Sequence, residues 1–402
     1  MIKTAILGYG TVGSGVAEVL RKNREVIRRH AGDEVQTAYV LDLREFPGDP
    51  VEEILVHEYE PILNDPDVRI VVETMGGLHP AYEFTKQALQ AGKSVCTSNK
   101  ELVAEHGVEL MKIAEEHQAN YMFEASCGGG IPVIRAMQTG LAADEIDAVT
   151  GILNGTTNYI LTRMEQDGCD FGEALAEAQR IGYAERNPEA DIEGYDAKRK
   201  IAILSSVAYG SHVDYTKVFT EGISRITTTD MQYAAALSAR IKLLGRSVRR
   251  GNDVSVMVAP MLVFRGNPLY DVNGVMNAIF VHGNMLGDAM FYGSGAGSLP
   301  TASAVSADIV DCAKNLGKNT ALPGTGETLN VCPADEAENA FFVRVGADEA
   351  VKAEACFGKI RSVTVPGIEG EAAFTTEVMT EAAFREKLRE ISDVKGYIRI
   401  CR

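Results

Sequence analysis

The chain has 402 residues and a formal net charge of −17, and its composition is 46% hydrophobic and 24% charged. This length exceeds what one hydrophobic core usually serves, so two or three domains are expected. The negative charge argues against nucleic acid as a partner, because phosphate binding requires a cationic surface. No apolar run approaches the ~20 residues needed to span a bilayer, so no membrane partner is expected.

The cysteines and the N-terminus indicate the compartment. The seven cysteines form no CxxC pair and no metal-ligand spacing, which predicts reduced thiols. The first residues lack the charged-then-apolar pattern of a signal peptide. These features predict a soluble, cytoplasmic protein.

Strand-like and helix-like patterns alternate through residues 1–130. Helical periodicity predicts helices at 13–29, 80–92 and 101–117. Short apolar runs predict strands at 4–8, 35–42, 68–77, 94–99 and 120–126. This alternation predicts an α/β domain with a doubly wound parallel sheet.

The rest of the chain mixes helices with β-rich stretches. We predict a second, α+β domain at residues 131–335 and a small α+β module at 340–402. A glycine-rich stretch at 291–301 leads into an apolar helix predicted at 302–316. We expect this helix to pack back on the first domain.

A glycine-rich turn follows the first predicted strand and opens the first helix. Its sequence is GxGxxG, formed by Gly8, Gly10, Thr11, Val12 and Gly13. The first two glycines allow a tight turn and a close approach of a pyrophosphate, and the third allows close helix–strand packing. In this context the motif predicts a Rossmann-type dinucleotide site rather than an ordinary glycine-rich turn.

The end of the second predicted strand bears on the choice of dinucleotide. Asp42 stands where an acidic residue binds the adenosine ribose of NAD. Arg44 follows it and is compatible with the 2′-phosphate of NADP. Two exposed loop charges without a cofactor role explain the pattern equally well, so the choice stays open.

Two further strand ends carry candidate residues. Lys100 opens a helix just after the strand at 94–99, where the positive end of the helix dipole disfavours a lysine. This position suggests a function, although exposed lysines are common. Glu124 precedes the turn 125–134, whose carbonyls suit a hard cation. From the residues alone, an ordinary strand-to-helix turn with Pro132 at the helix start explains that segment better.

Polar residues gather at the start of an apolar helix in "GILNGTTNYILTRM", residues 151–164. A helix N-terminus rich in hydroxyls and amides can receive a small carboxylate. Ordinary N-capping explains one or two of these residues but not all of them. The candidates are Asn154, Gly155, Thr156, Thr157 and Asn158.

The stretch "GYAERNPEADIEGYDAKRK", residues 182–200, begins acidic and ends basic. Its acids are Glu185, Glu189, Asp191, Glu193 and Asp196. A solvated surface loop is the ordinary interpretation of such a run. Asp196 and Lys200 are i,i+4 partners on a helix, a spacing that suits a pocket or a surface salt bridge equally.

Together, these motifs resemble the homoserine dehydrogenase family. The resemblance covers residues 1 to about 320, and its most specific parts are 151–164 and 182–204. The segments that carry it are "GYGTVGSGV", "VVETMGG", "TSNKELVA", "EASCGGGIPVI", "GILNGTTNYILTRM", "GYAERNPEADIEGYDAKRKIAIL" and "GSGAGSLPTASAVSADIVD".

The resemblance implies NAD(P)-linked interconversion of L-homoserine and L-aspartate 4-semialdehyde in threonine and methionine biosynthesis. It implies that residues 1–130 bind the cofactor and that 131–335 serve catalysis and dimerisation. Lys200 would exchange the proton at the substrate oxygen, with Lys100 as a second amine. The other implied contacts are Glu185, Asp191, Asp196, Asn154, Gly155 and Thr156 for the substrate, and Met75, Gly76, Ser98 and Gly297 for the cofactor.

The resemblance also implies a sodium site, a regulatory tail and an oligomer. Glu124 would bind sodium with the backbone oxygens of Cys127, Gly129 and Ile131. Residues 340–402 resemble a divergent ACT module without its usual glycine-turn start, and the family suggests a homodimer or homotetramer. Many members carry arginine where Leu41 stands. Two alternatives stay open, namely a related amino-acid oxidoreductase with another substrate and a non-enzymatic NAD(P)-binding sensor.

Overall fold

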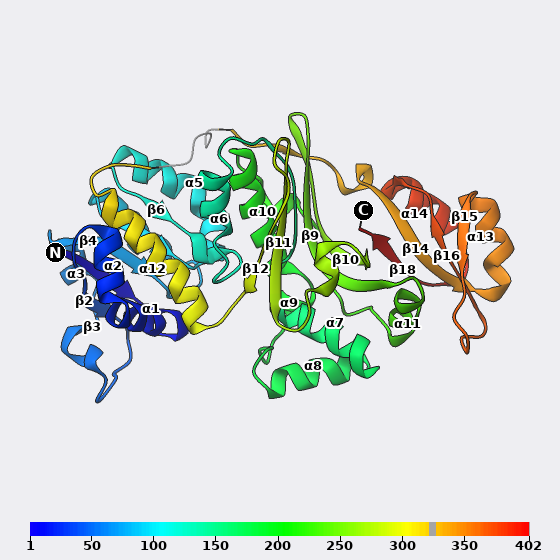
Figure 1. Cartoon of the computed structure of the whole chain (residues 1–402), viewed down its shortest axis with the longest axis horizontal. Helices are drawn as coiled ribbons and strands as arrows, with labels where there is room; N and C mark the ends of the chain where they lie inside the picture. Colours follow the sequence, from blue (N-terminus) through cyan, green and yellow to red (C-terminus); the bar gives the residue numbers. More distant parts are fainter. Residues whose placement is uncertain (321–326, 402) are drawn as a thin grey trace. The chain divides into compact units, whose positions relative to one another are not determined.

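The computed structural model describes residues 1–320 and 327–401, which divide into two compact units (Figure 1). Unit 1 comprises Met1–Glu145, Ile203–His212 and Phe291–Thr328, and unit 2 comprises Ile146–Ala202, Val213–Met290 and Leu329–Arg402. Within the described ranges, every helix is too short or too polar to cross a bilayer.

Unit 1 contains a sheet of parallel strands. In the described part of the chain it has six strands in the order β3-β2-β1-β4-β5-β6. This order reverses between β1 and β4, the position where such sheets bind ligands. The predicted doubly wound sheet is therefore confirmed. The strands are β1 (Ile2–Leu7), β2 (Val35–Leu41), β3 (Leu55–Val56), β4 (Val68–Glu73), β5 (Ser94–Thr97) and β6 (Tyr121–Met122).

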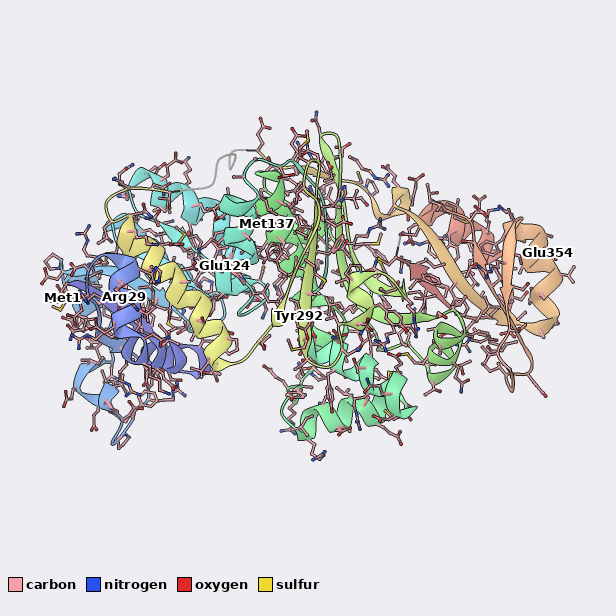
Figure 2. All side chains as sticks on the ribbon, viewed as in Figure 1. Met1, Arg29, Glu124, Met137, Tyr292 and Glu354 are labelled. Atoms are coloured by element: carbon pink, nitrogen blue, oxygen red, sulfur yellow. The ribbon has the colours of Figure 1, made fainter. Side chains whose placement is uncertain are left out.

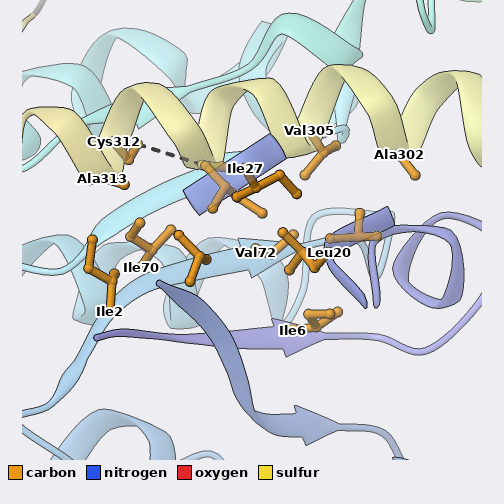
Figure 3. Close-up of a cluster of buried hydrophobic side chains, with 14 of the residues drawn as sticks. Ile2, Ile6, Leu20, Ile27, Ile70, Val72, Ala302, Val305, Cys312 and Ala313 are labelled. Carbon is orange, nitrogen blue, oxygen red and sulfur yellow. Dashed lines mark hydrogen bonds between the residues drawn. The ribbon is translucent and has the colours of Figure 1, made fainter. Parts of the chain in front are cut away.

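Helices cover this sheet, and the late helix α12 (Ser298–Lys314) lies along α1 and α2 (Figure 1). Their shared core includes Val72 and Val305 (Figure 3) together with Val16, all without solvent exposure. The apolar side chains of the helix predicted at 302–316 therefore pack against a buried surface formed by α1, α2 and the sheet. The other helices of unit 1 are α1 (Thr11–Lys22), α2 (Arg24–Ala31), α3 (Glu60–Asn64), α4 (Ala81–Gln90), α5 (Lys100–Glu116) and α6 (Val133–Arg135).

Three predicted elements of unit 1 have other bounds, each for a local reason. The helix predicted at 13–29 is two helices, because Asn23 leaves the helical conformation with φ −102° and ψ 18°. The strand predicted at 68–77 ends at Glu73, whose side chain accepts the N–H of Met75. The strand predicted at 120–126 ends at Met122, and the Glu124 N–H donates to Asp308 instead of a neighbouring strand.

Unit 2 contributes to a separate mixed sheet, ordered β12-β11-β7-β9-β10-β18-β14-β16-β15 in the described residues. Its central pairs are antiparallel. The predicted α+β character after residue 131 is thus confirmed. The strands are β7 (Ile146–Ile152), β8 (Phe219–Thr220), β9 (Ala239–Arg250), β10 (Asp253–Phe264), β11 (Met276–Gly283), β12 (Gly287–Ser294) and β13 (Asn330–Val331), and the helices are α7 (Gly155–Asp167), α8 (Phe171–Arg180), α9 (Glu189–Ile192), α10 (Tyr195–Tyr209) and α11 (Thr228–Ala236).

The C-terminal residues have the element order βαβββαβ and continue the same sheet. Strand β18 pairs in parallel with β10, with Leu262 opposite Ile400. Buried Arg399 also donates to Glu221, at 2.7 Å. Whether residues 338–401 form an ACT-like module stays a prediction. The elements are β14 (Glu338–Gly346), α13 (Ala350–Phe357), β15 (Ile360–Val363), β16 (Glu371–Thr376), β17 (Met379–Thr380), α14 (Glu381–Arg389) and β18 (Val394–Ile400).

A buried lysine joins three segments of unit 2. Lys242 on β9 is 1% exposed and donates to Asn158 Oδ1 (3.0 Å), the Val272 carbonyl (2.6 Å) and Asn273 Oδ1 (3.0 Å). Burial disfavours its charged form and lowers its pKa from 10.5 to about 8. The folded protein therefore releases this proton at a lower pH than the unfolded chain does.

Lys242 gives the stability of unit 2 a specific pH dependence. Between pH 8 and 10.5 the unfolded chain binds the proton and the folded protein does not, so stability should rise with pH. We expect the wild type to gain up to about 3 kcal/mol over this window relative to Lys242→Met. Urea unfolding at both ends of the window measures the difference, and parallel pH profiles for the two proteins would contradict it.

Candidate active site

The glycine turn after β1 has the geometry that a pyrophosphate needs. Gly8 has φ +89°, a conformation that favours glycine, and it packs against Met75. A Cβ on Gly13 would lie 1.9 Å from the Gly8 carbonyl oxygen, so only glycine fits there. A Cβ on Gly10 would meet no atom within 4 Å, which leaves space open beside the turn. Thr11 and Val12 follow in the first turn of α1.

Asp42 lies beside this turn, at the end of β2. Its carboxylate accepts the Tyr9 N–H (2.7 Å) and a two-pronged contact from Arg44, at 2.9 and 2.8 Å. The Arg44 guanidinium is the main reason that the pKa of Asp42 lies well below its usual range. Asp42 therefore stays ionised and holds Arg44 next to the glycine turn.

The ends of β4 and β5 bring together the next predicted cofactor contacts. Met75 and Gly76 donate their N–H groups to the Glu73 carboxylate, at 2.8 and 3.4 Å. The Ser98 N–H donates to the Glu73 carbonyl at 3.4 Å. Lys100 is the first residue of α5, which Asn99 caps through its side chain. These residues therefore lie at one edge of the sheet.

Gly297 lies next to the glycine turn. It has φ +109° and directly precedes α12. Its neighbour Ser298 donates a hydrogen bond to the Thr11 carbonyl at 2.6 Å. Residues almost 300 positions apart thus meet at the start of α1.

Glu124, labelled in Figure 2, is buried and begins the short turn Glu124–Ser126 of unit 1. Its carboxylate oxygens accept the N–H groups of Ile134 (2.8 Å) and Arg135 (2.7 Å), and burial raises its pKa. Gly129 in the neighbouring turn has φ +55°. Among the described residues, no group of three or more His, Cys, Asp or Glu side chains forms a metal site, so a cation there requires backbone oxygens such as those of Cys127, Gly129 and Ile131.

Three predicted substrate residues of unit 2, Asn154, Asp196 and the half-buried Asp191, form a hydrogen-bonded cluster. The Asn154 Oδ1 accepts the Thr157 N–H and caps α7. Its Nδ2 donates to Asp191 Oδ1 (2.7 Å) and to Asp196 Oδ2 (2.9 Å). One amide therefore holds two carboxylates together at the start of a helix. Burial, and then the Asp196 charge, raise the pKa of Asp191.

Lys200 completes this cluster from the second turn of α10. Its ammonium donates to Asp196 Oδ2 (2.7 Å) and to the Leu153 carbonyl (2.8 Å). Both side chains are buried, at 11% and 6% exposure. The i,i+4 pair is therefore a buried contact and not a surface salt bridge.

Gly155 and Thr156 directly follow Asn154 in α7, and Glu185 belongs to the acidic stretch 182–200. Glu185 is exposed, and its backbone carbonyl accepts a hydrogen bond from Gln179. Thr156 donates its hydroxyl to the Tyr183 carbonyl at 2.7 Å, which ties the start of α7 to the acidic stretch. A Cβ on Gly155 would lie 2.7 Å from the Val275 carbonyl. The 154–158 turn and the 182–200 stretch thus form one site.

The structure adds two contacts that sequence analysis did not assign. Glu73 holds the turns after β4 and β5, and the Leu153 carbonyl orients Lys200. The sequence did contain a signal for Glu73, because it is the one carboxylate at the end of the apolar run "VRIVVE". A backbone carbonyl gives no sequence signal at all.

Family models match most of the chain. Residues 8–124 match "Homoserine dehydrogenase, NAD binding domain", and residues 132–310 match "Homoserine dehydrogenase". The homoserine dehydrogenase of Neisseria gonorrhoeae is 40% identical over 367 residues, covering 87% of this chain and 82% of that protein. That of Bacillus subtilis is 35% identical and covers 98% and 95%. The chain belongs to the homoserine dehydrogenase family.

Solved structures of this family have the same fold. The crystal structure of the homoserine dehydrogenase from Thiobacillus denitrificans gives a TM-score of 0.91 at 36% identity, covering 100% of this chain and 98% of that one. A hyperthermophilic archaeal homoserine dehydrogenase in complex with NADPH gives 0.65 at 27% identity, covering 77% and 97%. The predicted homoserine dehydrogenase, an oxidoreductase acting on a CH–OH group with an NAD-binding domain, is thus confirmed.

The glycine turn can be tested with two substitutions that differ in their physical effect. Gly13→Ala forces a clash inside the protein and should lower the melting temperature by several degrees. Gly10→Ala has room in the folded chain but fills the space beside the turn, so it should fold normally and bind NADH and NADPH at least about tenfold more weakly. Thermal unfolding and cofactor fluorescence titration measure both. Unchanged cofactor affinity in Gly10→Ala would rule out pyrophosphate binding at this turn.

Proposed function

We propose that this chain interconverts L-homoserine and L-aspartate 4-semialdehyde through Lys200, with NAD or NADP as the cofactor, in threonine and methionine biosynthesis. The observation that carries the proposal is the Asp191–Asn154–Asp196–Lys200 cluster at the start of α7. The family match and the NADPH complex of an archaeal relative support it.

The substrate is a zwitterion, and the site offers a partner for each charge. The N-terminus of α7, with Gly155 and Thr156, suits the carboxylate because its N–H groups and dipole attract anions. Asp196 and Asp191, with the exposed Glu185 of the same acidic stretch, are the proposed partners of the substrate ammonium.

Lys200 is the proposed proton carrier. In oxidation, its neutral amine takes the hydroxyl proton while C4 loses hydride and becomes the aldehyde carbon. In the reverse direction, its ammonium returns the proton to the aldehyde oxygen. The nicotinamide, when bound, accepts or supplies the hydride. Asp196 and the Leu153 carbonyl fix the direction of the amine, and Lys100 serves as a second amine at the start of α5.

A sodium ion beside Glu124 is also part of the proposal. Buried Glu124 accepts hydrogen bonds from the backbone N–H groups of Ile134 and Arg135, and because burial raises its pKa, a cation beside it would favour its ionised form. The carbonyls of Cys127, Gly129 and Ile131 are hard oxygen ligands. The ion would stabilise the turn that precedes α6.

For assembly we propose a cytoplasmic homodimer or homotetramer. Strand β12 stands at the end of the sheet order and exposes alternate residues, including Met290 (40%) and Tyr292 (55%). Such an exposed apolar edge suits pairing with a second copy. Apart from the two-residue strand β17, the C-terminal element order is βαββαβ, which supports an ACT-like module.

Lys200→Ala should abolish the oxidation of L-homoserine and leave NADH and NADPH affinity unchanged. Loss of a positioned general base typically costs 10²–10⁴-fold in kcat. The matched control is Lys198→Ala, since a lysine two residues away on α10 points to another face. Steady-state rates and fluorescence titration give the two readouts. Wild-type turnover in Lys200→Ala would refute the proposed mechanism.

Asp42 should set the preference between the two cofactors. Its ionised carboxylate would repel a 2′-phosphate, and it holds Arg44. We therefore expect Asp42→Ser to raise kcat/KM for NADP relative to NAD by about tenfold. An unchanged ratio would show that the end of β2 does not select the cofactor.

A further inference from the structure

Glu73 is a buried carboxylate at the carboxyl end of β4 that the proposed mechanism does not use. It has no solvent exposure, and burial raises its pKa. A buried carboxyl group is costly unless its oxygens are hydrogen-bonded, and such groups are retained where they organise their surroundings. We therefore expect the Glu73 carboxylate to hold neighbouring groups in fixed positions.

One oxygen of Glu73 fixes the turn after its own strand. Oε1 accepts the N–H groups of Met75 (2.8 Å) and Gly76 (3.4 Å). Gly76 has φ +76°, so the chain turns sharply here. The preceding Thr74 donates its hydroxyl to the Gly8 carbonyl at 2.9 Å, which ties the same turn to the glycine motif.

The other oxygen of Glu73 fixes the turn after the neighbouring strand β5. Oε2 accepts the Thr97 hydroxyl at 2.6 Å, and Thr97 Oγ1 in turn accepts the Asn99 N–H at 2.9 Å. The Asn99 side chain caps α5 by accepting the Leu102 N–H. Its amide nitrogen donates to the Gly77 carbonyl at 2.6 Å, and this bond connects the start of α5 to the turn after β4. The hydrogen bonds thus form a closed circuit between the two turns.

We propose that Glu73 is a positioning residue for hydride transfer, which fixes the Met75–Gly77 turn and the start of α5 that carries Lys100. This inference rests on the proposed function for the roles of the cofactor turn and Lys100. Glu73 is fully buried, and its carboxylate oxygens accept hydrogen bonds from Met75, Gly76 and Thr97 of the protein itself. Its role is indirect, because one of its oxygens fixes the turn after β4 and the other fixes the turn after β5.

The hydrogen-bond geometry predicts which substitutions are tolerated. Glu73→Ala leaves two backbone N–H groups and the Thr97 hydroxyl unpaired, and should lower kcat/KM for L-homoserine oxidation by about tenfold or more while raising KM for the cofactor. Glu73→Gln keeps an acceptor for the Met75 N–H, and its NH2 group can donate to Thr97 Oγ1 in place of the bond that the Thr97 hydroxyl donates to Glu73, so it should recover most of the loss. If Gln is no better than Ala, the acceptor geometry is not the relevant property and the inference is overturned.

Thr97→Val tests the same circuit without changing Glu73. It removes the link to Asn99 at nearly constant volume, and its effect on kcat/KM should not add to that of Glu73→Ala in the double variant. The control is Thr4→Val, which removes a buried hydrogen bond to Gln36 in the same sheet, away from both turns. Thr4→Val should change only the melting temperature.

The outcomes separate this inference from the proposed function. If the wild type oxidises L-homoserine and the folded Glu73→Ala and Thr97→Val variants keep wild-type kcat and KM, the positioning role is overturned. If the wild type does not oxidise L-homoserine, the proposed function fails, and fluorescence titration with NADH and NADPH decides the inference. Weaker binding in Glu73→Ala supports it, and equal binding overturns it.

Discussion

The buried ion pair between Lys200 and Asp196 is the interaction on which the rest of the site depends. Removing two charges from water costs several kcal/mol per ion unless further hydrogen bonds satisfy them. Here the Asn154 amide and the Leu153 carbonyl supply those bonds. The same Asn154 caps α7, so the geometry of the ion pair is coupled to the helix start that suits the substrate carboxylate.

The net charge of −17 is unfavourable for an anionic cofactor, so an anionic cofactor in unit 1 requires local groups that attract it. The geometry of the glycine turn provides such groups. Gly13 allows close packing below the turn, Gly10 leaves space beside it, and α1 directs its N-terminus there. Arg44 adds a cation that Asp42 holds in place. Net charge therefore does not decide cofactor binding, since a few oriented groups do.

Local patterns in the sequence predicted much of the fold and of the cluster geometry. The spacing of Asp196 and Lys200 placed both on one helical face, and the residue types at 154–158 indicated a capped helix start. These inferences need only the helical repeat and capping chemistry. The parallel sheet followed from the alternation of strand and helix patterns.

Contacts between distant segments were beyond the reach of such patterns. Asn154 bonds Asp191 and Asp196, which are 37 and 42 residues away. The parallel pairing of β18 with β10 depends on register between strands separated by more than 100 residues. The strand predicted at 120–126 failed for the same reason, since Asp308 supplies the acceptor that ends it. Sequence periodicity indicates which face of a helix or strand is buried, but it does not indicate which other segment packs against that face.

Chemical rescue of Lys200→Ala shows whether the Lys200 amine carries the proton. The assay measures L-homoserine oxidation by this variant while small primary amines are added. Activity should return in a saturable manner, in proportion to the neutral form of the added amine. A variant that binds both ligands normally but shows no recovery with any small amine would contradict a proton-carrying role for Lys200.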